Sequence, residues 1–190
     1  MAASPDVIDR TTAVVVLIDM QERLAAAMQR RDAVVRASAL LGRVADVLGT
    51  PVIVTRQYPE GLGDTVEELA VVPGAGAPVD KTVFDCTLEP AFMERLEASG
   101  ASQVVLTGME THICVMQTAL SLVRSGYRVH VVADAVCSRR DQDRDTALDR
   151  LRAAGVTVTT AESVIYEALG RAGTPEFREV LGLVKEMPLG

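Results

Sequence analysis

The 190-residue sequence is poor in the residues on which metal, redox and disulfide-stabilised proteins depend. It has two histidines, three cysteines and no tryptophan. No pair of histidines has metal-ligand spacing, so no metal site is expected. Three widely spaced cysteines argue against a disulfide framework and for a reducing cytoplasm, which is the location we expect.

Long apolar runs and clusters of basic residues are also absent. No apolar run reaches the roughly 18 residues that a membrane span needs, and the first ten residues do not resemble a secretory signal. The net charge is -7, and contacts to phosphates need clustered lysine and arginine. The nucleotide motifs GxGxxG and GxxxxGK[ST] are missing too. We therefore expect no membrane or nucleic-acid partner and no cofactor.

Short β-branched runs alternate with segments of helical periodicity. The run AVVVLI at 13–18 is typical of a strand buried on both faces. Further strands are predicted at 51–55, 81–84, 103–107, 128–133 and 156–159, and helices are predicted between them. This alternation predicts a three-layer α/β/α sandwich, with a parallel six-stranded sheet in the Rossmann-like order 3-2-1-4-5-6.

Cys114 is the first candidate for a catalytic residue, because it falls in the first turn of the helix predicted over 111–125. Gly108 would allow a sharp exit from the preceding strand, and Thr111 is predicted to cap the helix. Free N–H groups and the helix dipole would favour a thiolate there and could hold an oxyanion. A buried structural cysteine is the alternative, since free cysteines are among the most buried residues.

Asp19 and Lys81 could complete a reaction centre with Cys114. Asp19 ends the first strand, and the predicted strand order places it opposite Cys114 at the carboxyl edge of the sheet. It could accept the thiol proton and later pass it to a leaving amine, although a helix N-cap is the alternative. Lys81 would stabilise both anions if its loop lies beside them; otherwise a lone lysine is a surface residue.

Four segments together resemble the isochorismatase-like cysteine hydrolase superfamily. They are VVVLIDMQ, DKTVF, LTGMETHICVMQTAL and YRVHVVADAVCSR. The similarity extends from about residue 7 to 185, and VIVTRQYPEGLGDTVEEL is similar to the single-domain isochorismatase-domain-containing proteins. The resemblance implies one hydrolase domain over 1–190, with the six-stranded parallel sheet of the superfamily.

The resemblance also implies functions for individual residues. Asp19, Lys81 and Cys114 match the positions of the family's Asp-Lys-Cys triad. A cis peptide bond is implied between Met109 and Glu110, where it would direct the Glu110 and Cys114 amides at an oxyanion.

Departures from the family pattern narrow this interpretation. Nicotinamidases carry metal-binding histidines after the second strand, where this chain reads RQYPEGLGDT, so a zinc-dependent nicotinamidase is disfavoured. Some isochorismatases lack the cysteine, whereas its presence here favours covalent attack. Asp85 stands where the family often has serine, which leaves the preferences of the pocket open.

We therefore expect a hydrolase of a small amide- or imide-like substrate that acts through a thioester-type intermediate. The residues predicted to line its pocket are Gln57, Tyr58, Phe84 and His112, with Gln21 and Arg23 as weaker candidates. Isochorismatase-type hydrolysis of a vinyl ether, with Asp19 as general acid, is one alternative. A non-enzymatic thiol module for redox sensing or partner binding is the other. A homo-oligomer is expected, with 71–78 and 181–189 as candidate contact surfaces.

Overall fold

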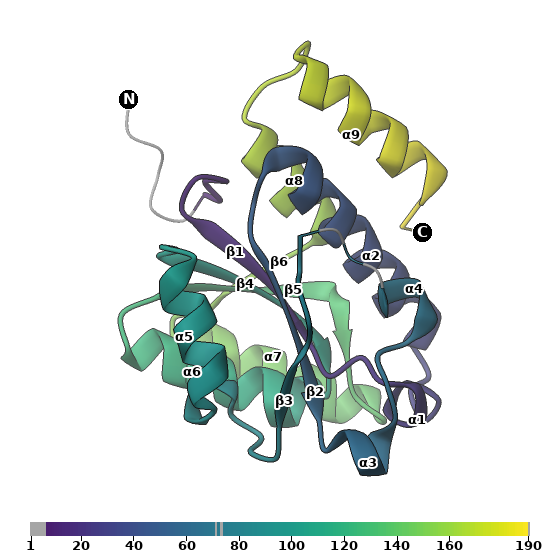
Figure 1. Ribbon diagram of the computed structural model, residues 1–190, viewed down its shortest axis with the longest axis vertical. Helices are drawn as coiled ribbons and strands as arrows, with labels where there is room; N and C mark the ends of the chain where they lie inside the picture. The colour runs from purple at the N-terminus through teal and green to yellow at the C-terminus, as the bar shows by residue number, and fades with distance from the viewer. Residues whose placement is uncertain (1–6, 71, 73, 190) are drawn as a thin grey trace.

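A computed structural model describes residues 7–70, 72 and 74–189, and it has a parallel sheet with helices on both faces (Figure 1). The strands are β1 (Ala13–Ile18), β2 (Val52–Gln57), β3 (Val79–Lys81), β4 (Gln103–Met109), β5 (Arg128–Cys137) and β6 (Thr157–Thr159). Their order is β3-β2-β1-β4-β5-β6, and each adjacent pair is parallel. The predicted fold is confirmed.

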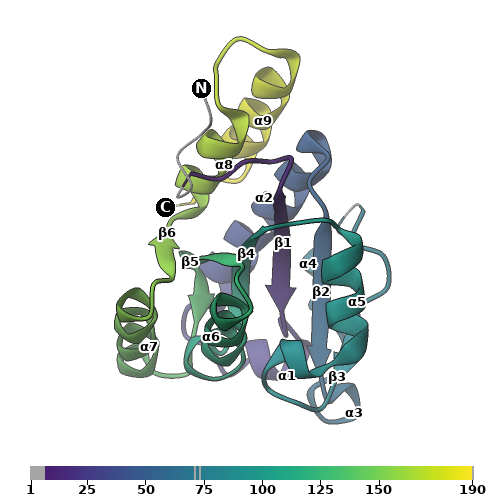
Figure 2. The same cartoon turned by 90° about the vertical axis from the view of Figure 1, so that its left-hand side faces the viewer.

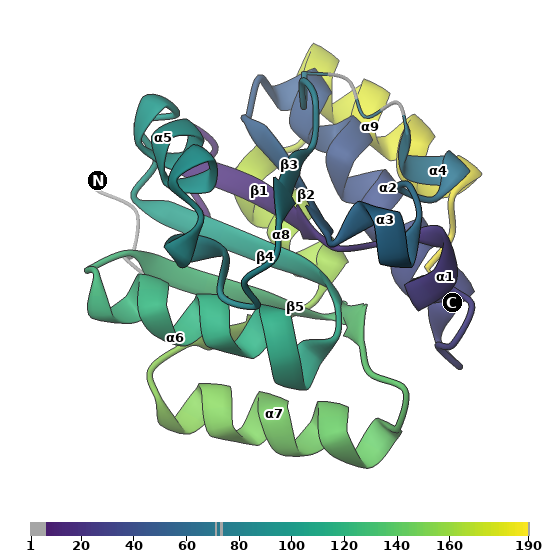
Figure 3. The ribbon, with the colours of Figure 1, turned by 60° about the horizontal axis from the view of Figure 1, so that its bottom comes forward.

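The helices form two layers, with α2, α8 and α9 on one face of the sheet and α5, α6 and α7 on the other (Figures 2 and 3). The α-helices are α1 (Glu22–Ala25), α2 (Arg31–Leu48), α3 (Pro59–Leu62), α4 (Glu67–Ala70), α5 (Pro90–Ala98), α6 (Met116–Arg124), α7 (Asp141–Ala153), α8 (Ala161–Leu169) and α9 (Pro175–Glu186). A 3-10 turn, η1 (Cys86–Leu88), and a π-helical turn, η2 (Thr111–Val115), precede α5 and α6. No helix in the described ranges is long and apolar enough to cross a membrane.

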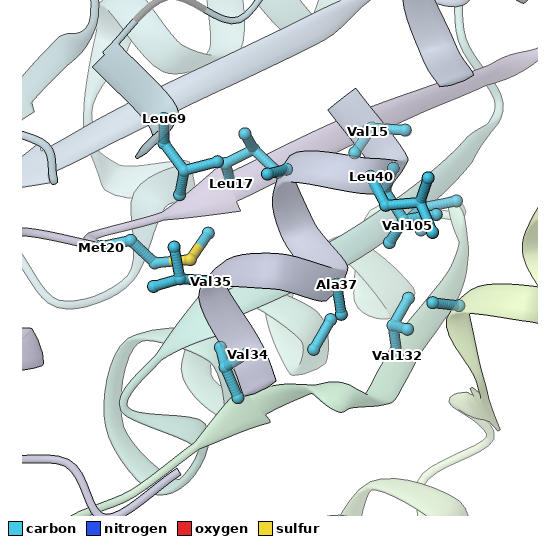
Figure 4. Packing of buried hydrophobic residues seen from close by; sticks show 14 of the residues in the cluster. Val15, Leu17, Met20, Val34, Val35, Ala37, Leu40, Leu69, Val105 and Val132 are labelled. Carbon is cyan, nitrogen blue, oxygen red and sulfur yellow. The ribbon is translucent and has the colours of Figure 1, made fainter. Parts of the chain in front are cut away.

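The side chains of β1 alternate between two apolar cores. Val15 and Leu17 pack on the α2 side with Leu40 and Val105 (Figure 4), whereas the residues between them face α5 and α6. Every residue of β1 is buried, which is why the run reads as continuously apolar. These two cores fix the position of the residue that follows β1.

One predicted boundary differs from the structure. The third strand is Val79–Lys81 and not 81–84, because Val79 enters the core while Phe84 is an exposed residue in a bend. The segment 181–189 remains a predicted contact surface, and its residues Leu183, Val184, Met187 and Leu189 are partly buried against the protein's own core. In the segment 71–78, positions 71 and 73 lie outside the described residues, while Ala75 is buried.

Candidate active site

Asp19 lies directly after β1, with its side chain buried among the ends of neighbouring strands. Its backbone adopts a left-handed conformation, with φ of 52°, which is uncommon for a residue with a side chain. The Asp19 N–H donates to the Thr55 carbonyl of β2 at 3.2 Å, and the Thr55 hydroxyl donates to Oδ1 of Asp19 at 2.7 Å. The end of β2 therefore fixes the carboxylate.

Lys81 is the last residue of β3, and its ammonium group is enclosed by oxygen acceptors. Nζ lies 2.6 Å from Oδ2 of Asp19, 2.7 Å from Oε1 of Gln57 and 3.3 Å from the Val83 carbonyl. Burial is the largest single influence on Lys81 and opposes its charged form. The charge and hydrogen bond of Asp19, together with the sulfurs of Cys86 and Cys114, outweigh burial in combination and raise the pKa of Lys81. The result is a buried ion pair in which each ammonium N–H has an acceptor.

Cys114 lies in the turn η2 with only 5% of its surface exposed. Its thiol is within hydrogen-bonding reach of Asp19, while Lys81 is near enough to act on it electrostatically. Burial, followed by the negative charge of Asp19, raises the pKa of Cys114 well above the usual value for a thiol, and Lys81 only partly opposes this. The structure thus brings Asp19, Lys81 and Cys114 together at the carboxyl edge.

The predicted N-cap is wrong, and the raised pKa of Cys114 argues against a thiolate in the resting protein. The helix begins with a π-helical turn, and Glu110, not Thr111, occupies the N-cap position. The Thr111 hydroxyl is buried without a hydrogen-bond partner. The loss of hydration on burial outweighs the stabilisation that a helix N-terminus and Lys81 give to a sulfur anion. Burial therefore favours the neutral thiol at Cys114.

Gly108 lies within β4, where β4 passes very close to β1. Its φ is +121°, and a Cβ atom added there would lie 2.0 Å from the Ile18 carbonyl oxygen. Gly108 therefore permits the close approach of two strands at the site, in addition to preceding the turn. One residue further along the chain, the peptide bond between Met109 and Glu110 is cis.

Glu110 is a buried acid that joins the segment before Cys114 to the end of β5. Its carboxylate accepts hydrogen bonds from the backbone N–H of Arg139 at 2.9 Å and from Arg139 Nε at 3.1 Å. Only 5% of the Glu110 side chain is exposed, against 60% for Arg139. This contact places a second charge pair beside the turn that carries Cys114.

The four predicted pocket residues take different positions. Gln57 binds Lys81 through Oε1 and the Thr82 carbonyl through Nε2 at 2.8 Å, so it supports Lys81. Tyr58 and Phe84 are each 54% exposed. His112 Nδ1 pairs with the Ser138 hydroxyl at 2.9 Å, and the side chain lines a cavity of about 260 Å³ between η2 and α7.

The two weaker candidates connect loops. Gln21 is fully buried and bonds the backbone of Gln57 and the Gly63 carbonyl, and Arg23 donates to the Gly61 carbonyl at 2.8 Å. The carboxylate of Asp85 accepts from Thr87 N–H and from the Ser121 hydroxyl of α6. These contacts give the side chains of Gln21, Arg23 and Asp85 structural roles.

Sequence reasoning missed Thr55 and Cys86. Cys86 is fully buried beside Thr55 and Thr118, and burial raises its pKa to about 12 even though Lys81 opposes the shift. Thr118 also accepts the Cys86 N–H at 2.9 Å. A polar residue inside the apolar run VIVT was the available signal for Thr55, but nothing in the sequence indicated Cys86.

The isochorismatase domain model matches residues 13–163. The chain belongs to the isochorismatase family. Isochorismatase domain-containing protein 1 of Salmo salar is 41% identical over 174 residues, which are 92% of this chain and 61% of that protein. Isochorismatase domain-containing protein 2 of Bos taurus is 43% identical over 90% of this chain and 81% of its own. The chain thus spans about three-fifths of the first of these relatives.

Solved structures of family members have the same fold. The MAR1 ribonuclease of Caenorhabditis elegans matches with a TM-score of 0.88 and 36% identity, over 95% of this chain and 94% of its own. YcaC of Escherichia coli, an octameric hydrolase of unknown specificity, matches with a TM-score of 0.88 and 26% identity over 98% and 93%. YcaC of Pseudomonas aeruginosa, solved with covalent acrylamide, matches with a TM-score of 0.87 and 26% identity over 96% and 93%. The chain thus shares its fold with these proteins over nearly its whole length.

Proposed function

We propose that the chain hydrolyses a C–N bond in a small amide- or imide-like substrate, with Cys114 as the nucleophile. The observation that carries this proposal is the buried thiol of Cys114 beside the Asp19 carboxylate, which lies 2.6 Å from Lys81 Nζ. Such an arrangement pairs a nucleophile with a base and orients the base through a third group.

The chemistry begins with a neutral thiol, so proton transfer and attack occur together. Asp19 accepts the Cys114 proton as sulfur bonds to the substrate carbonyl carbon, and the amides of Glu110 and Cys114 stabilise the oxyanion. The C–N bond then breaks, and the amine leaves with the proton from Asp19. The product of this half-reaction is a thioester on Cys114.

The second half-reaction returns the enzyme to its starting state. Water adds to the thioester carbon and gives a proton to Asp19. The C–S bond breaks, the acid is released, and sulfur regains the proton from Asp19. Lys81 holds one carboxylate oxygen throughout, and Thr55 holds the other, so that the base keeps its position.

The alternatives fit the geometry less well. The ion pair with Lys81 presents Asp19 as a proton acceptor, which suits a base better than the general acid of vinyl-ether hydrolysis. Redox-sensing cysteines have accessible thiols of low pKa, whereas Cys114 is buried and its pKa is raised. The C. elegans relative is named a ribonuclease, but the net charge of -7 on this chain opposes binding of RNA phosphates.

Replacement of the sulfur tests the proposal. A panel of small amides, imides and activated esters should give turnover, and intact-mass spectra should show the acyl group on Cys114. Cys114→Ser should lower the rate by about 10⁴-fold or more, while Cys137→Ser, at another buried cysteine, should keep it. Hydrolysis of a vinyl ether that survives Cys114→Ser would favour the ether-hydrolysis mechanism. We also propose a homo-oligomer, since the E. coli relative is octameric; light scattering would test it.

A further inference from the structure

The cavity of about 260 Å³ between η2 and α7 is separate from the candidate active site. Neither Asp19, Lys81 nor Cys114 lines it. Figure 3 shows α7 beside α6, whereas β3, which ends with Lys81, lies toward the opposite edge of the sheet. His112 lines the cavity from η2, and residues two apart in a helical turn face different ways. The cavity and the Cys114 sulfur are therefore on different sides of the turn.

His112 contributes a hydrogen-bond donor to this cavity. Its Nδ1 lies 2.9 Å from the hydroxyl oxygen of Ser138, which is only 1% exposed. The proton of a buried hydroxyl needs an acceptor, and Nδ1 is the one within reach in the part of the chain that the structure describes. The ring that accepts at Nδ1 carries its own proton on Nε2. Nε2 is thus left as a donor for a group inside the cavity.

Three further donors line the cavity from one face of α7. Gln142, Thr146 and Arg150 follow one another at intervals of four residues, so their side chains lie on the same side of the helix. All three are exposed. Their side chains form no hydrogen bond or ion pair with any residue in the described ranges. The amide, hydroxyl and guanidinium groups are therefore free to bind a ligand.

The cavity is positively charged, although the chain as a whole has a net charge of -7. Asp143 is the acid among the described lining residues, and its two carboxylate oxygens accept from Arg140 at 2.8 and 2.9 Å. Arg140 thus neutralises Asp143. Along α7, the positions three and four residues from Arg150 are Thr146 or alanine, so no neighbouring acid on its face of the helix offsets its charge. A ligand that fits these surroundings is an anion.

We propose that this cavity is a second ligand site, which binds the phosphate group of a small organic phosphate ester. The donors are the Arg150 guanidinium, His112 Nε2, the Gln142 amide and the Thr146 hydroxyl. Phosphate oxygens point in several directions, which suits donors on both sides of the cavity, and a guanidinium pairs with two of them at once. Met116 and Ala147 complete the lining with apolar surface for the organic group. The proposal does not depend on the chemistry of Cys114.

The two histidines of the chain allow a specific test. Carbon–proton NMR spectra of the imidazole rings contain one set of signals for each, and His112→Gln identifies those of His112. The protein is titrated with phenyl phosphate, inorganic phosphate and benzoate at constant pH, with sodium chloride keeping the ionic strength constant. The His112 signals should shift and saturate with phenyl phosphate. The signals of His130, 2% exposed within β5, should stay in place.

The affinities should follow the contacts that the cavity offers. Phenyl phosphate should bind at least about threefold more tightly than inorganic phosphate, which lacks the apolar group, and at least about threefold more tightly than benzoate, which has fewer oxygens. Arg150→Ala should weaken binding of phenyl phosphate by about tenfold or more. Arg152→Ala is the matched control, because it removes the same charge from α7 where Arg152 pairs with Asp149 at 2.8 Å. It should change the affinity by less than about twofold.

Equal weakening by Arg150→Ala and Arg152→Ala would mean that only the net charge matters, and it would contradict a site at Arg150. Signals of His112 that do not shift with either phosphate probe would exclude the site, and equal affinity for benzoate would overturn the phosphate class. Alkylation of Cys114 with iodoacetamide separates this inference from the proposed function. Phenyl phosphate should still bind to the alkylated protein; loss of binding would place the anion in the candidate active site instead.

Discussion

The interior of the sheet and its carboxyl edge differ in the residues that they bury and in the regularity of their backbone. Within β1 every side chain is apolar and buried, and the strand is in regular register with β4. A few residues further on, Asp19 and Lys81 are buried charges, Asp19 has a left-handed backbone, and Cys114 lies in a π-helical turn. The regular interior stabilises the fold enough to hold an edge that breaks local preferences, and such exceptions gather where function resides.

Removing the buried cation Lys81 from the carboxyl edge should have the largest effect on stability and turnover. Lys81→Met leaves the Asp19 carboxylate buried without a counter-charge, so we expect the free energy of unfolding to fall by about 3–5 kcal/mol, with loss of turnover. Urea unfolding measures the change. Lys185 is exposed on α9, so Lys185→Met is the control and should shift stability by less than about 0.5 kcal/mol. Adding Asp19→Asn to Lys81→Met should recover part of the loss; without recovery the two residues are not coupled.

A deletion in the regular interior should affect stability and spare the chemistry. Leu106 is fully buried in β4, and Leu106→Ala should lower the free energy of unfolding by about 2–5 kcal/mol. The kcat per folded molecule should stay near that of the parent protein at a temperature where both are folded. A large fall in kcat would mean that the core and the edge are not separable.

The buried thiols should produce a smaller, pH-dependent effect. Burial raises the pKa of Cys86 and of Cys137 to about 12, whereas thiols in the unfolded chain titrate near about 8.5. The folded state therefore retains protons that the unfolded state releases. Their contribution is complete below the unfolded pKa and is lost as the pH rises through the folded pKa, at a limiting slope of about 1.4 kcal/mol per pH unit for each thiol.

Urea unfolding between pH 8 and 11 measures this slope. Cys137→Ser removes one titrating thiol and should make the loss of stability with pH less steep. A slope that does not change in this variant would mean that Cys137 titrates alike in the folded and unfolded states.

The sequence allowed the sheet order and the convergence of Asp19, Lys81 and Cys114 to be predicted, because strand alternation and matching motifs both specify the carboxyl edge. It did not allow the ionisation state of Cys114 to be predicted, because the cost of burying a sulfur anion depends on packing that no short pattern records. The contact of Cys86 with Thr55 joins residues 31 positions apart across the sheet. The sequence predicts Gln57 as a pocket residue, whereas in the structure it supports Lys81. That contact depends on the register of β2 and β3, which the sequence does not specify.

The pH dependence of Cys114 alkylation by iodoacetamide, compared between the parent protein and Asp19→Asn, tests the central claim most directly. A free cysteine has a pKa of about 8.5. In the parent, burial and the Asp19 charge should place the midpoint of alkylation above that value. Asp19→Asn removes the negative charge and keeps Lys81, so the midpoint should fall and alkylation at pH 7 should become faster while hydrolysis is lost. A midpoint that stays in place or rises would show that the carboxylate does not control the sulfur, and it would contradict Asp19 as the base.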